Sequence, residues 1–214
     1  MLSSRGMNEI NQPVTTPEKP KKNWFSTHGE ILSTIGILIA APVLAILLTI
    51  FVFQSYEVDG PSMETTLQDN DRLIVNKLGK TWTKVNGSDY IPDRYSIIVF
   101  HSHSSFSANG ENKQLIKRVM GIPGDRVVIS KGLVKLFNSE NPAGFSPDEQ
   151  GPQAGVIENT TGNLDETVED GEVFVMGDNR ENSLDSRNFG PVKSSDIVGE
   201  LSFRIFPFNS IKHF

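Results

Sequence analysis

The chain has 214 residues, with 26 acidic and 20 basic side chains, a formal net charge of −6 and no cysteine. The lack of cysteine excludes disulfides, a thiolate nucleophile and cysteine-ligated metal sites. The mild acidity argues against a protein that binds a phosphate backbone, because such surfaces are usually basic. Nucleic acid is therefore not expected as a partner, and the length allows one or two modest domains.

The first two segments of the chain differ sharply in composition. Residues 1–30 are polar and interrupted by proline, so we expect a mobile tail. Residues 31–53 carry no charge, and about 23 residues at about 1.5 Å each can cross the roughly 30 Å hydrocarbon core of a membrane. A buried helix seldom runs so long without a polar face, and the apolar part of a cleavable signal peptide is typically about 7 to 15 residues long. The composition favours a retained transmembrane anchor.

The orientation of this anchor follows from the basic residues on its two sides. No lysine or arginine lies between residue 54 and Arg72. Those before the anchor are Arg5, Lys19, Lys21 and Lys22. Because cytoplasmic flanks carry the excess of basic residues, we expect a single-pass protein of the cell membrane, with its N-terminus in the cytoplasm and residues 54–214 outside.

Beyond the anchor, short apolar or β-branched runs alternate with turn residues, which is typical of a mainly β domain. The runs are residues 72–78, 96–100, 114–120, 125–130, 133–137, 171–176 and 198–206. Lys131 and Gly132 separate two of them, and glycine tolerates the positive φ that tight hairpin turns require. The sequence therefore predicts an antiparallel β-sheet ectodomain after one transmembrane helix.

Two polar stretches interrupt this pattern. Residues 138–170 are rich in Gly, Pro, Asn, Glu and Gln, so we expect a long surface excursion or a small, poorly packed subdomain. His101 and His103 form the only close histidine pair, in a polar stretch without an acidic residue. We interpret that stretch as a solvated loop and expect no metal site.

The run at 114–120 contains a lysine among apolar residues. In an extended strand Leu115, Lys117 and Val119 share one face. Apolar surroundings disfavour the ammonium form, lower the lysine pKa and are the usual way a lysine becomes a base near neutral pH. Arg118 cannot serve, because a guanidinium stays protonated. The alternative is a structural lysine whose amine extends to water.

Residues 174–192 form a strand that enters a loop dense in Asp, Asn, Arg and Ser. Such side chains bond to the local backbone and to one another, which makes the loop rigid. The spacing of Asp185 and Arg187 allows an ion pair. A loop of this kind either positions catalytic groups or forms a structural corner, and composition alone does not decide between them.

Five motifs in chain order carry a resemblance to a known family. They are "GPSMETTL" at residues 60–67, "DNDRLIVNKL" at 69–78, "RYSIIVF" at 94–100, "KRVMGIPGD" at 117–125 and "GDNRENSLDSRNFGPV" at 177–192. Together with the N-terminal anchor, they resemble the successive motifs of bacterial type I signal peptidases in their single-anchor form. The last motif is the most specific because of its length.

The resemblance implies a serine protease that uses a Ser-Lys dyad, with neither cofactor nor metal. Ser62 matches the nucleophile and Lys117 the general base. Ser183 matches the residue that orients the lysine amine, while Asp185 and Arg187 match a supporting ion pair. The implied partners are the signal peptides of translocated preproteins and the lipid bilayer that holds them.

The resemblance also implies an oxyanion hole and a substrate pocket. The Ser62 N–H is one expected donor. Some relatives add a serine hydroxyl at the position of Gly60, so here a second donor must come from the backbone or elsewhere. Shallow apolar pockets should accept small side chains at the first and third positions before the cut. Phe203 and Phe206 are candidates for an apolar rim that rests on the bilayer, unless they belong to an ordinary strand core.

Two positions depart from the common motifs. Thr65 stands where the family usually has proline, which puts the rigidity next to Ser62 in doubt. Arg94 to Ile97 replace the common R-G-D-I, and we expect a modified turn there without lost activity. Two other functions stay open: a specialised relative that processes a dedicated pilin or secreted partner, and a non-catalytic module that binds signal sequences.

Overall fold

The computed structural model describes residues 24–102, 113–157 and 159–214. The four basic residues that suggested the orientation of the anchor, most of the expected tail, and His103 lie outside these ranges. The chain divides into two compact units, residues 1–44 and residues 45–214. Each unit is described by itself.

Helix α1 (Trp24–Phe51) contains the apolar segment and includes Pro42. Within it, Ser33–Phe51 is the one helix of the described ranges that is long and apolar enough to cross a membrane. None of this stretch is buried in the protein, as expected for a helix whose apolar side chains face lipid. The helix ends at Phe51, two residues before the expected limit, because Phe53 already begins a strand.

The larger sheet is antiparallel throughout, with the order β1-β2-β10-β3-β4-β8-β9 and with β11 paired to β10. Its strands are β1 (Phe53–Glu57), β2 (Arg72–Asn76), β3 (Ile97–Ser102), β4 (Lys113–Gly121), β8 (Glu172–Met176), β9 (Val192–Lys193), β10 (Ile197–Phe206) and β11 (Lys212–His213). The predicted mainly β, antiparallel class is confirmed. Each apolar run of the sequence overlaps with a strand of this sheet or of a smaller one.

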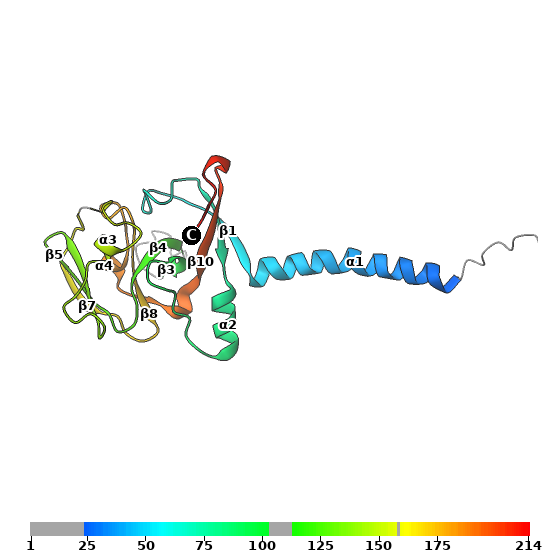
Figure 1. Ribbon diagram of the computed structural model, residues 1–214, viewed down its shortest axis with the longest axis horizontal. Helices are drawn as coiled ribbons and strands as arrows, with labels where there is room; N and C mark the ends of the chain where they lie inside the picture. Colours follow the sequence, from blue (N-terminus) through cyan, green and yellow to red (C-terminus); the bar gives the residue numbers. More distant parts are fainter. Residues whose placement is uncertain (1–23, 103–112, 158) are drawn as a thin grey trace, which may run out of the picture. The chain divides into compact units, whose positions relative to one another are not determined.

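The smaller sheet has the order β6-β5-β7, formed by β5 (Arg126–Ser130), β6 (Leu133–Phe137) and β7 (Leu164–Thr167). In Figure 1 it lies at the opposite end of the 45–214 unit from β1 and β10. The predicted hairpin joins β5 to β6, and Lys131 and Gly132 both have the positive φ, 52° and 82°, that its turn requires.

The excursion at residues 138–170 is a surface segment that is fixed to the domain at several points. It contains α3 (Pro147–Gln150) and β7, which pairs with β5. Pro147, Thr160 and Val168 are buried, and Val168 packs in the cluster beneath the smaller sheet.

The remaining short elements were not predicted. They are α2 (Leu78–Asn86), α4 (Ser186–Phe189), η1 (Ser194–Asp196) and η2 (Phe208–Ser210). The run at residues 72–78 was interpreted as one strand, but the strand stops at Asn76 and a helix starts at Leu78. At the altered motif before β3, Tyr95 has a φ of 74° in the place of the common glycine. The turn therefore forms with a residue for which this conformation costs about 1 to 2 kcal/mol.

Candidate active site

Ser62 lies in the loop that joins β1 to β2. The loop is fixed by Met63 and Leu67, whose side chains are fully buried in one core cluster with Leu73. The Leu67 N–H donates to the Met63 carbonyl, and the Asn179 N–H donates to the carbonyl of Ser62 at 3.1 Å. The methionine next to Ser62 is thus an apolar anchor that fixes the backbone beside a partly exposed serine hydroxyl.

Gly60 shapes the entrance to this loop. Its φ is 96°, a conformation that side chains other than glycine rarely adopt. Its N–H donates to Asp69 Oδ1 at 2.8 Å, so this donor is already used. Among the described residues, none accepts a hydrogen bond from the Ser62 N–H. The Ser62 N–H is therefore the better candidate for an oxyanion donor, and Gly60 contributes the turn.

Lys117 lies on β4 with only 2 % of its surface exposed. Its Nζ lies 2.7 Å from Ser62 Oγ and donates to the Ile116 carbonyl at 2.8 Å. Burial lowers the pKa of Lys117 to about 8, and the carboxylates of Asp185 and Asp178 oppose this shift in part. The strand thus brings a lysine that can be neutral near physiological pH to the hydroxyl of Ser62.

An apolar cavity adjoins these two side chains. It is lined by Ser62 and Lys117 together with Tyr56, Glu57, Val58, Asp59, Leu73, Val99, Lys113, Gln114, Leu115 and Ile116. The walls come from β1 and the loop after it, β2, β3 and β4, and combine aliphatic side chains with charged ones. A pocket of this kind suits small apolar groups next to the reacting atoms.

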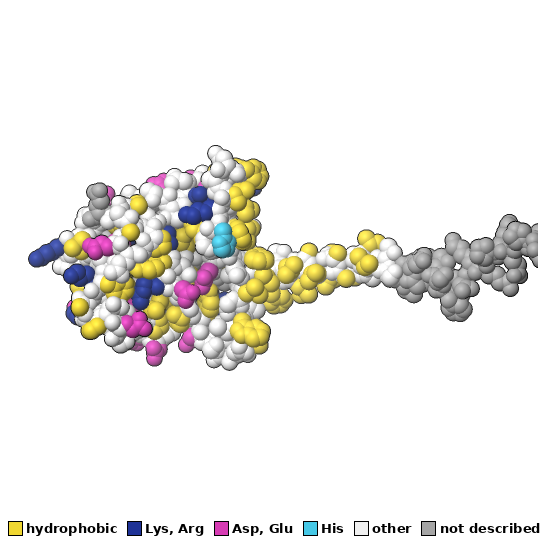
Figure 2. All heavy atoms as spheres, viewed as in Figure 1, with side chains coloured by type: hydrophobic (Ala, Val, Ile, Leu, Met, Phe, Trp, Pro, Cys, Tyr) yellow, Lys and Arg dark blue, Asp and Glu magenta, His cyan; other side chains and the backbone are white. Residues whose placement is uncertain are grey.

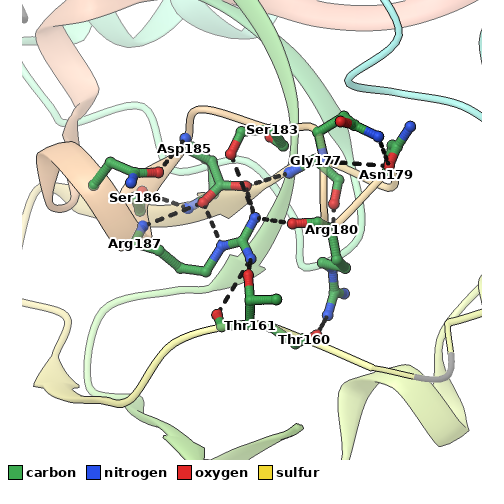
Figure 3. Close-up of polar contacts among 12 residues, drawn as sticks. Thr160, Thr161, Gly177, Asn179, Arg180, Ser183, Asp185, Ser186 and Arg187 are labelled. Carbon is green, nitrogen blue, oxygen red and sulfur yellow. Dashed lines mark hydrogen bonds and ion pairs between the residues drawn. The ribbon is translucent and has the colours of Figure 1, made fainter.

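The loop after β8 supports this site through Asp185 and Arg187, which Figure 3 shows side by side. Asp185 is fully buried and accepts hydrogen bonds from the Gly177 N–H at 3.0 Å and from Arg187 Nε and Nη2 at 2.8 Å. It also caps α4, in a capping box with Asn188. The predicted ion pair is present, and the hydrogen bond from the Gly177 N–H to Asp185 joins the start of the loop to its end.

Ser183 lies beside Gly177 in the same loop. A Cβ at Gly177 would stand 2.3 Å from Ser183 Oγ and 2.5 Å from the Ser62 carbonyl oxygen, so only glycine fits between the two serines. The Ser183 hydroxyl is buried and has no hydrogen-bond partner within the described part of the chain. A hydrogen bond from Ser183 to the Lys117 amine is not present in this arrangement, although the hydroxyl is close to the site and available.

The sequence analysis did not single out Arg118, Asp178, Thr66 or Gln153 as supports of the site. Arg118 donates to both oxygens of Asp178 at 2.8 and 2.7 Å and to the Tyr95 carbonyl at 2.8 Å. Thr66 Oγ1 donates to Asp178 Oδ2 at 2.5 Å. A signal for Arg118 was present in the sequence, since an arginine that alternates with Lys117 on a buried strand requires an acidic partner.

No group of three metal-binding side chains occurs among residues 24–102, 113–157 and 159–214. His101 lies on β3, and His103 lies outside the described ranges. The expectation of a site without metal or cofactor stays a prediction.

Comparison with known proteins gives the family. Residues 31–206 match the family model described as signal peptidase, peptidase S26. The chain is 36% identical over 200 residues to a signal peptidase I of Bacillus amyloliquefaciens, covering 91% of this chain and 98% of the relative. It is 31% identical over 193 residues to a signal peptidase IB of Staphylococcus aureus strain COL, covering 86% of this chain and 94% of the relative.

A crystal structure of a signal peptidase I from Enterococcus faecalis V583 is 30% identical and has a TM-score of 0.39, covering 52% of this chain and 97% of that one. The resemblance noted from the five motifs is confirmed by the family match and by the two sequence relatives. The chain belongs to the S26 family of signal peptidases and is a hydrolase of the signal peptidase I type.

Proposed function

We propose that the protein removes signal peptides from translocated preproteins with Ser62 as nucleophile and Lys117 as general base. The observation that carries this proposal is the 2.7 Å distance between Lys117 Nζ and Ser62 Oγ at a lysine that is 2 % exposed. Burial keeps the amine neutral over part of the physiological pH range, and the contact gives the proton a direct route.

The reaction starts when neutral Lys117 takes the proton of Ser62 Oγ while this oxygen bonds to the carbonyl carbon of the scissile peptide. The resulting oxyanion is stabilised by the Ser62 N–H, and one such donor is worth about 3 kcal/mol. The C–N bond then breaks, and the Lys117 ammonium gives its proton to the leaving amine. A water molecule, deprotonated by Lys117, attacks the acyl ester and releases Ser62.

The remaining site residues act on the lysine. Ser183 is the candidate that orients the amine, since its hydroxyl is buried, unpaired within the described chain and close to the Ser62 backbone. A small rotation of the Ser183 or the Lys117 side chain during the reaction would allow the hydroxyl to form a hydrogen bond with the amine. Asp185 and Arg187 hold the loop that carries Ser183, and the Asp185 charge moderates the loss of basicity at Lys117.

The membrane anchor places this chemistry near its substrate. Signal peptides are apolar segments, and a peptidase that is anchored by α1 would meet them at the bilayer surface. The cavity beside Ser62 would accept the small residue before the cut. Phe203 and Phe206 are 40% and 41% exposed on β10, as a rim that contacts lipid would require. The cytoplasmic N-terminus is part of the proposal and is supported by the basic residues before α1.

The test uses the full chain in detergent with a preprotein, and sequences the N-terminus of the product. We expect cleavage after a small residue and a loss of about 10³-fold or more in Ser62→Ala and Lys117→Ala. Ser130→Ala and Lys135→Ala, at exposed positions of the smaller sheet, are the matched controls. Cleavage that survives Ser62→Ala or Lys117→Ala would rule out the dyad. If the unmodified chain bound the preprotein without cleaving it, the non-catalytic module would be favoured. Testing several preproteins in parallel distinguishes a general enzyme, which cleaves many, from a dedicated one, which cleaves one.

A further inference from the structure

Helix α2 presents an apolar face to the outside of the protein. Leu78, Trp82 and Val85 are 49%, 70% and 76% exposed, and their spacing of four and three residues places them on one side of the helix. None of the residues of α2 is buried. Figure 2 shows a hydrophobic patch at the surface in the place of α2, amid white atoms. Three large apolar side chains on one face are more than the scattered exposure that a surface normally shows.

The described residues leave this face open. Leu78, Trp82 and Val85 line a shallow hollow with Gly79 and Thr81, and no other element contributes to its walls. The opposite side of the helix is attached to the domain, because Lys80 Nζ donates to the Ser194 carbonyl. The helix is therefore held by its polar side while its apolar side faces outward. This is the reverse of the way a helix packs on a soluble core.

The start of α2 is tied to the end of α1. The Lys77 N–H donates to the Val52 carbonyl at 2.7 Å, and Lys77 Nζ donates to the Ile50 carbonyl at 2.6 Å. Thr81 Oγ1 donates to the Phe51 carbonyl at 3.0 Å. The Ile50 and Phe51 carbonyls belong to the last turn of α1, where no further helical N–H is available to them, and Val52 directly follows the helix. The outward face of α2 thus begins at the residues where the apolar segment ends.

The composition of α2 suits the boundary between water and lipid. Tryptophan is enriched at that boundary because its ring is apolar and its N–H polar. Lys84 is exposed on the same helix, and exposed lysine side chains beside a bilayer attract anionic headgroups. The location beside the end of a membrane-spanning candidate selects lipid over a soluble protein as the occupant.

We propose that α2 is an interfacial helix that lies on the membrane surface and inserts Leu78, Trp82 and Val85 among the lipid headgroups and upper acyl chains. It would fix the height of the catalytic loop above the bilayer, at the end of α1 from which the domain emerges. The proposal rests on the membrane anchoring assumed in the proposed function. It does not depend on which side of the membrane the domain occupies.

The first experiment measures the depth of Trp82 in vesicles. The chain has two tryptophans, so Trp24→Phe leaves Trp82 as the only one. With the full chain in mixed phosphatidylcholine and phosphatidylglycerol vesicles, we expect blue-shifted Trp82 emission that brominated phosphatidylcholine quenches and aqueous iodide does not. Emission of a water-exposed indole that iodide quenches and brominated lipid leaves unchanged would overturn the proposal, and is the result expected if a protein partner covers this face.

A matched control places the probe at the other end of the domain. Leu133, on the hairpin of the smaller sheet, is 53% exposed. Leu133→Trp in a Trp24→Phe, Trp82→Phe background should be quenched by iodide and not by brominated lipid. The quenching assay needs no activity. Lipid quenching of Trp82 in a protein that cleaves nothing would therefore uphold the interfacial helix while the proposed function fails.

The second experiment separates the membrane substrate from a soluble one. In the variant Trp82→Glu, Val85→Glu we expect cleavage of a vesicle-embedded preprotein to fall about tenfold, since two carboxylates oppose insertion. Cleavage of a short soluble peptide should be unchanged, and Leu133→Glu should affect neither substrate. Equal loss on both substrates, or no loss on either, would contradict the role of α2 in setting the height of the site.

Discussion

Two ion pairs of the domain have the same geometry and different surroundings. Arg118 Nη2 lies 2.7 Å from Asp178 Oδ2, where β4 meets the loop after β8. Arg126 Nε lies 2.7 Å from Asp165 Oδ1, where β5 meets β7 in the smaller sheet. The first pair has side chains that are 6% and 2% exposed, and the second has side chains that are 52% and 55% exposed. If distance alone determined the contribution of an ion pair to stability, the two pairs would contribute equally.

The difference lies in what happens when one partner is removed. A buried charge that loses its partner keeps its full desolvation cost, whereas an exposed charge is rehydrated at once. The ion pairs of Arg118 with Asp178 and of Arg187 with Asp185, which support the catalytic loops, are of the buried kind, and so is Lys117. We therefore expect substitutions to have effects that follow burial and proximity to Ser62, and the predictions below test this ranking from the largest effect to the smallest.

The largest effect concerns the charge on Lys117 as the pH changes. Burial lowers its pKa to about 8, and the reaction requires the neutral amine, so kcat/KM should fall about tenfold per pH unit below about 8 and level off above it. The measurement is a pH profile of kcat/KM on a soluble peptide. Lys113 is a like charge that helps to lower this pKa, so Lys113→Gln should move the midpoint to higher pH. A kcat/KM that does not change between about pH 6 and about pH 9 would contradict a lysine base.

The next effect concerns Asp178. Asp178→Asn leaves the buried Arg118 guanidinium without a charged partner, which costs about 3 to 5 kcal/mol of unfolding free energy. Activity should fall as well, since Thr66, four residues from Ser62, must then compete with Arg118 for a single amide oxygen. The free energy of unfolding of the full chain in detergent, measured by denaturant, checks this. Asp170→Asn, at an exposed position, is the control. If the variant were as stable as the control, burial of an ion pair would not determine how much stability its loss costs.

A smaller loss is expected at Asp148, in α3 of the excursion. Arg180 Nη1 donates to Asp148 Oδ2 at 2.7 Å, and the two side chains are 3% and 11% exposed. Arg180 keeps the Thr160 hydroxyl and the Gly177 carbonyl as acceptors, so Asp148→Asn should cost less, about 2 kcal/mol. Denaturant unfolding measures it, and Glu149→Gln beside it should have no effect. A loss equal to that of Asp178→Asn would mean that the other acceptors of Arg180 contribute nothing.

A weaker effect is expected at Gln153, also in the excursion. Its amide donates to Thr66 Oγ1 and to Asp178 Oδ2, so it holds the loop in which Thr65 replaces the usual proline. Gln153→Ala should lower kcat a few-fold, on the order of 1 kcal/mol, with little change in KM. Thr65→Pro should restore the loss, because proline restricts the same backbone. Gln150→Ala is the control, and failure of Thr65→Pro to restore kcat would exclude a role for Gln153 in loop rigidity.

The strands of this fold could be predicted from local pattern, because each apolar run is short and bounded by turn residues. The hairpin at Lys131 and Gly132 follows from one glycine. Helix α2 could not be predicted in the same way, since Leu78 continues the apolar run of β2 and its own apolar face points outward. A prediction that treats every apolar residue as buried therefore assigns Leu78 to the strand and not to the helix. Four strands were not predicted: β1 directly follows the apolar anchor, β7 lies within a polar excursion, and β9 and β11 have only two residues each.

The site was predictable in part for a similar reason. The alternation of β4 placed Lys117 on an apolar face, and the motif resemblance paired it with Ser62, 55 residues away. The network around Thr66, Arg118 and Asp178 joins three segments that only the fold brings together. Gln153 carried no signal, because a glutamine in a Gly- and Pro-rich stretch looks like any solvated loop residue. Which polar residue becomes a support depends on tertiary contacts that periodicity does not encode.

The smallest effect is expected at the exposed pair, where the comparison began. Asp165→Asn and Arg126→Gln each remove a partner from a contact as short as that of Arg118 and Asp178, yet both charges are then solvated by water. We expect the unfolding midpoint and kcat/KM to stay within error of the unmodified chain. Raising the salt concentration should change neither variant relative to it, since screening already weakens exposed pairs. A destabilisation comparable to that of Asp178→Asn would show that pair geometry, and not burial, determines stability in this domain, and the ranking of the other predictions would have to be reversed.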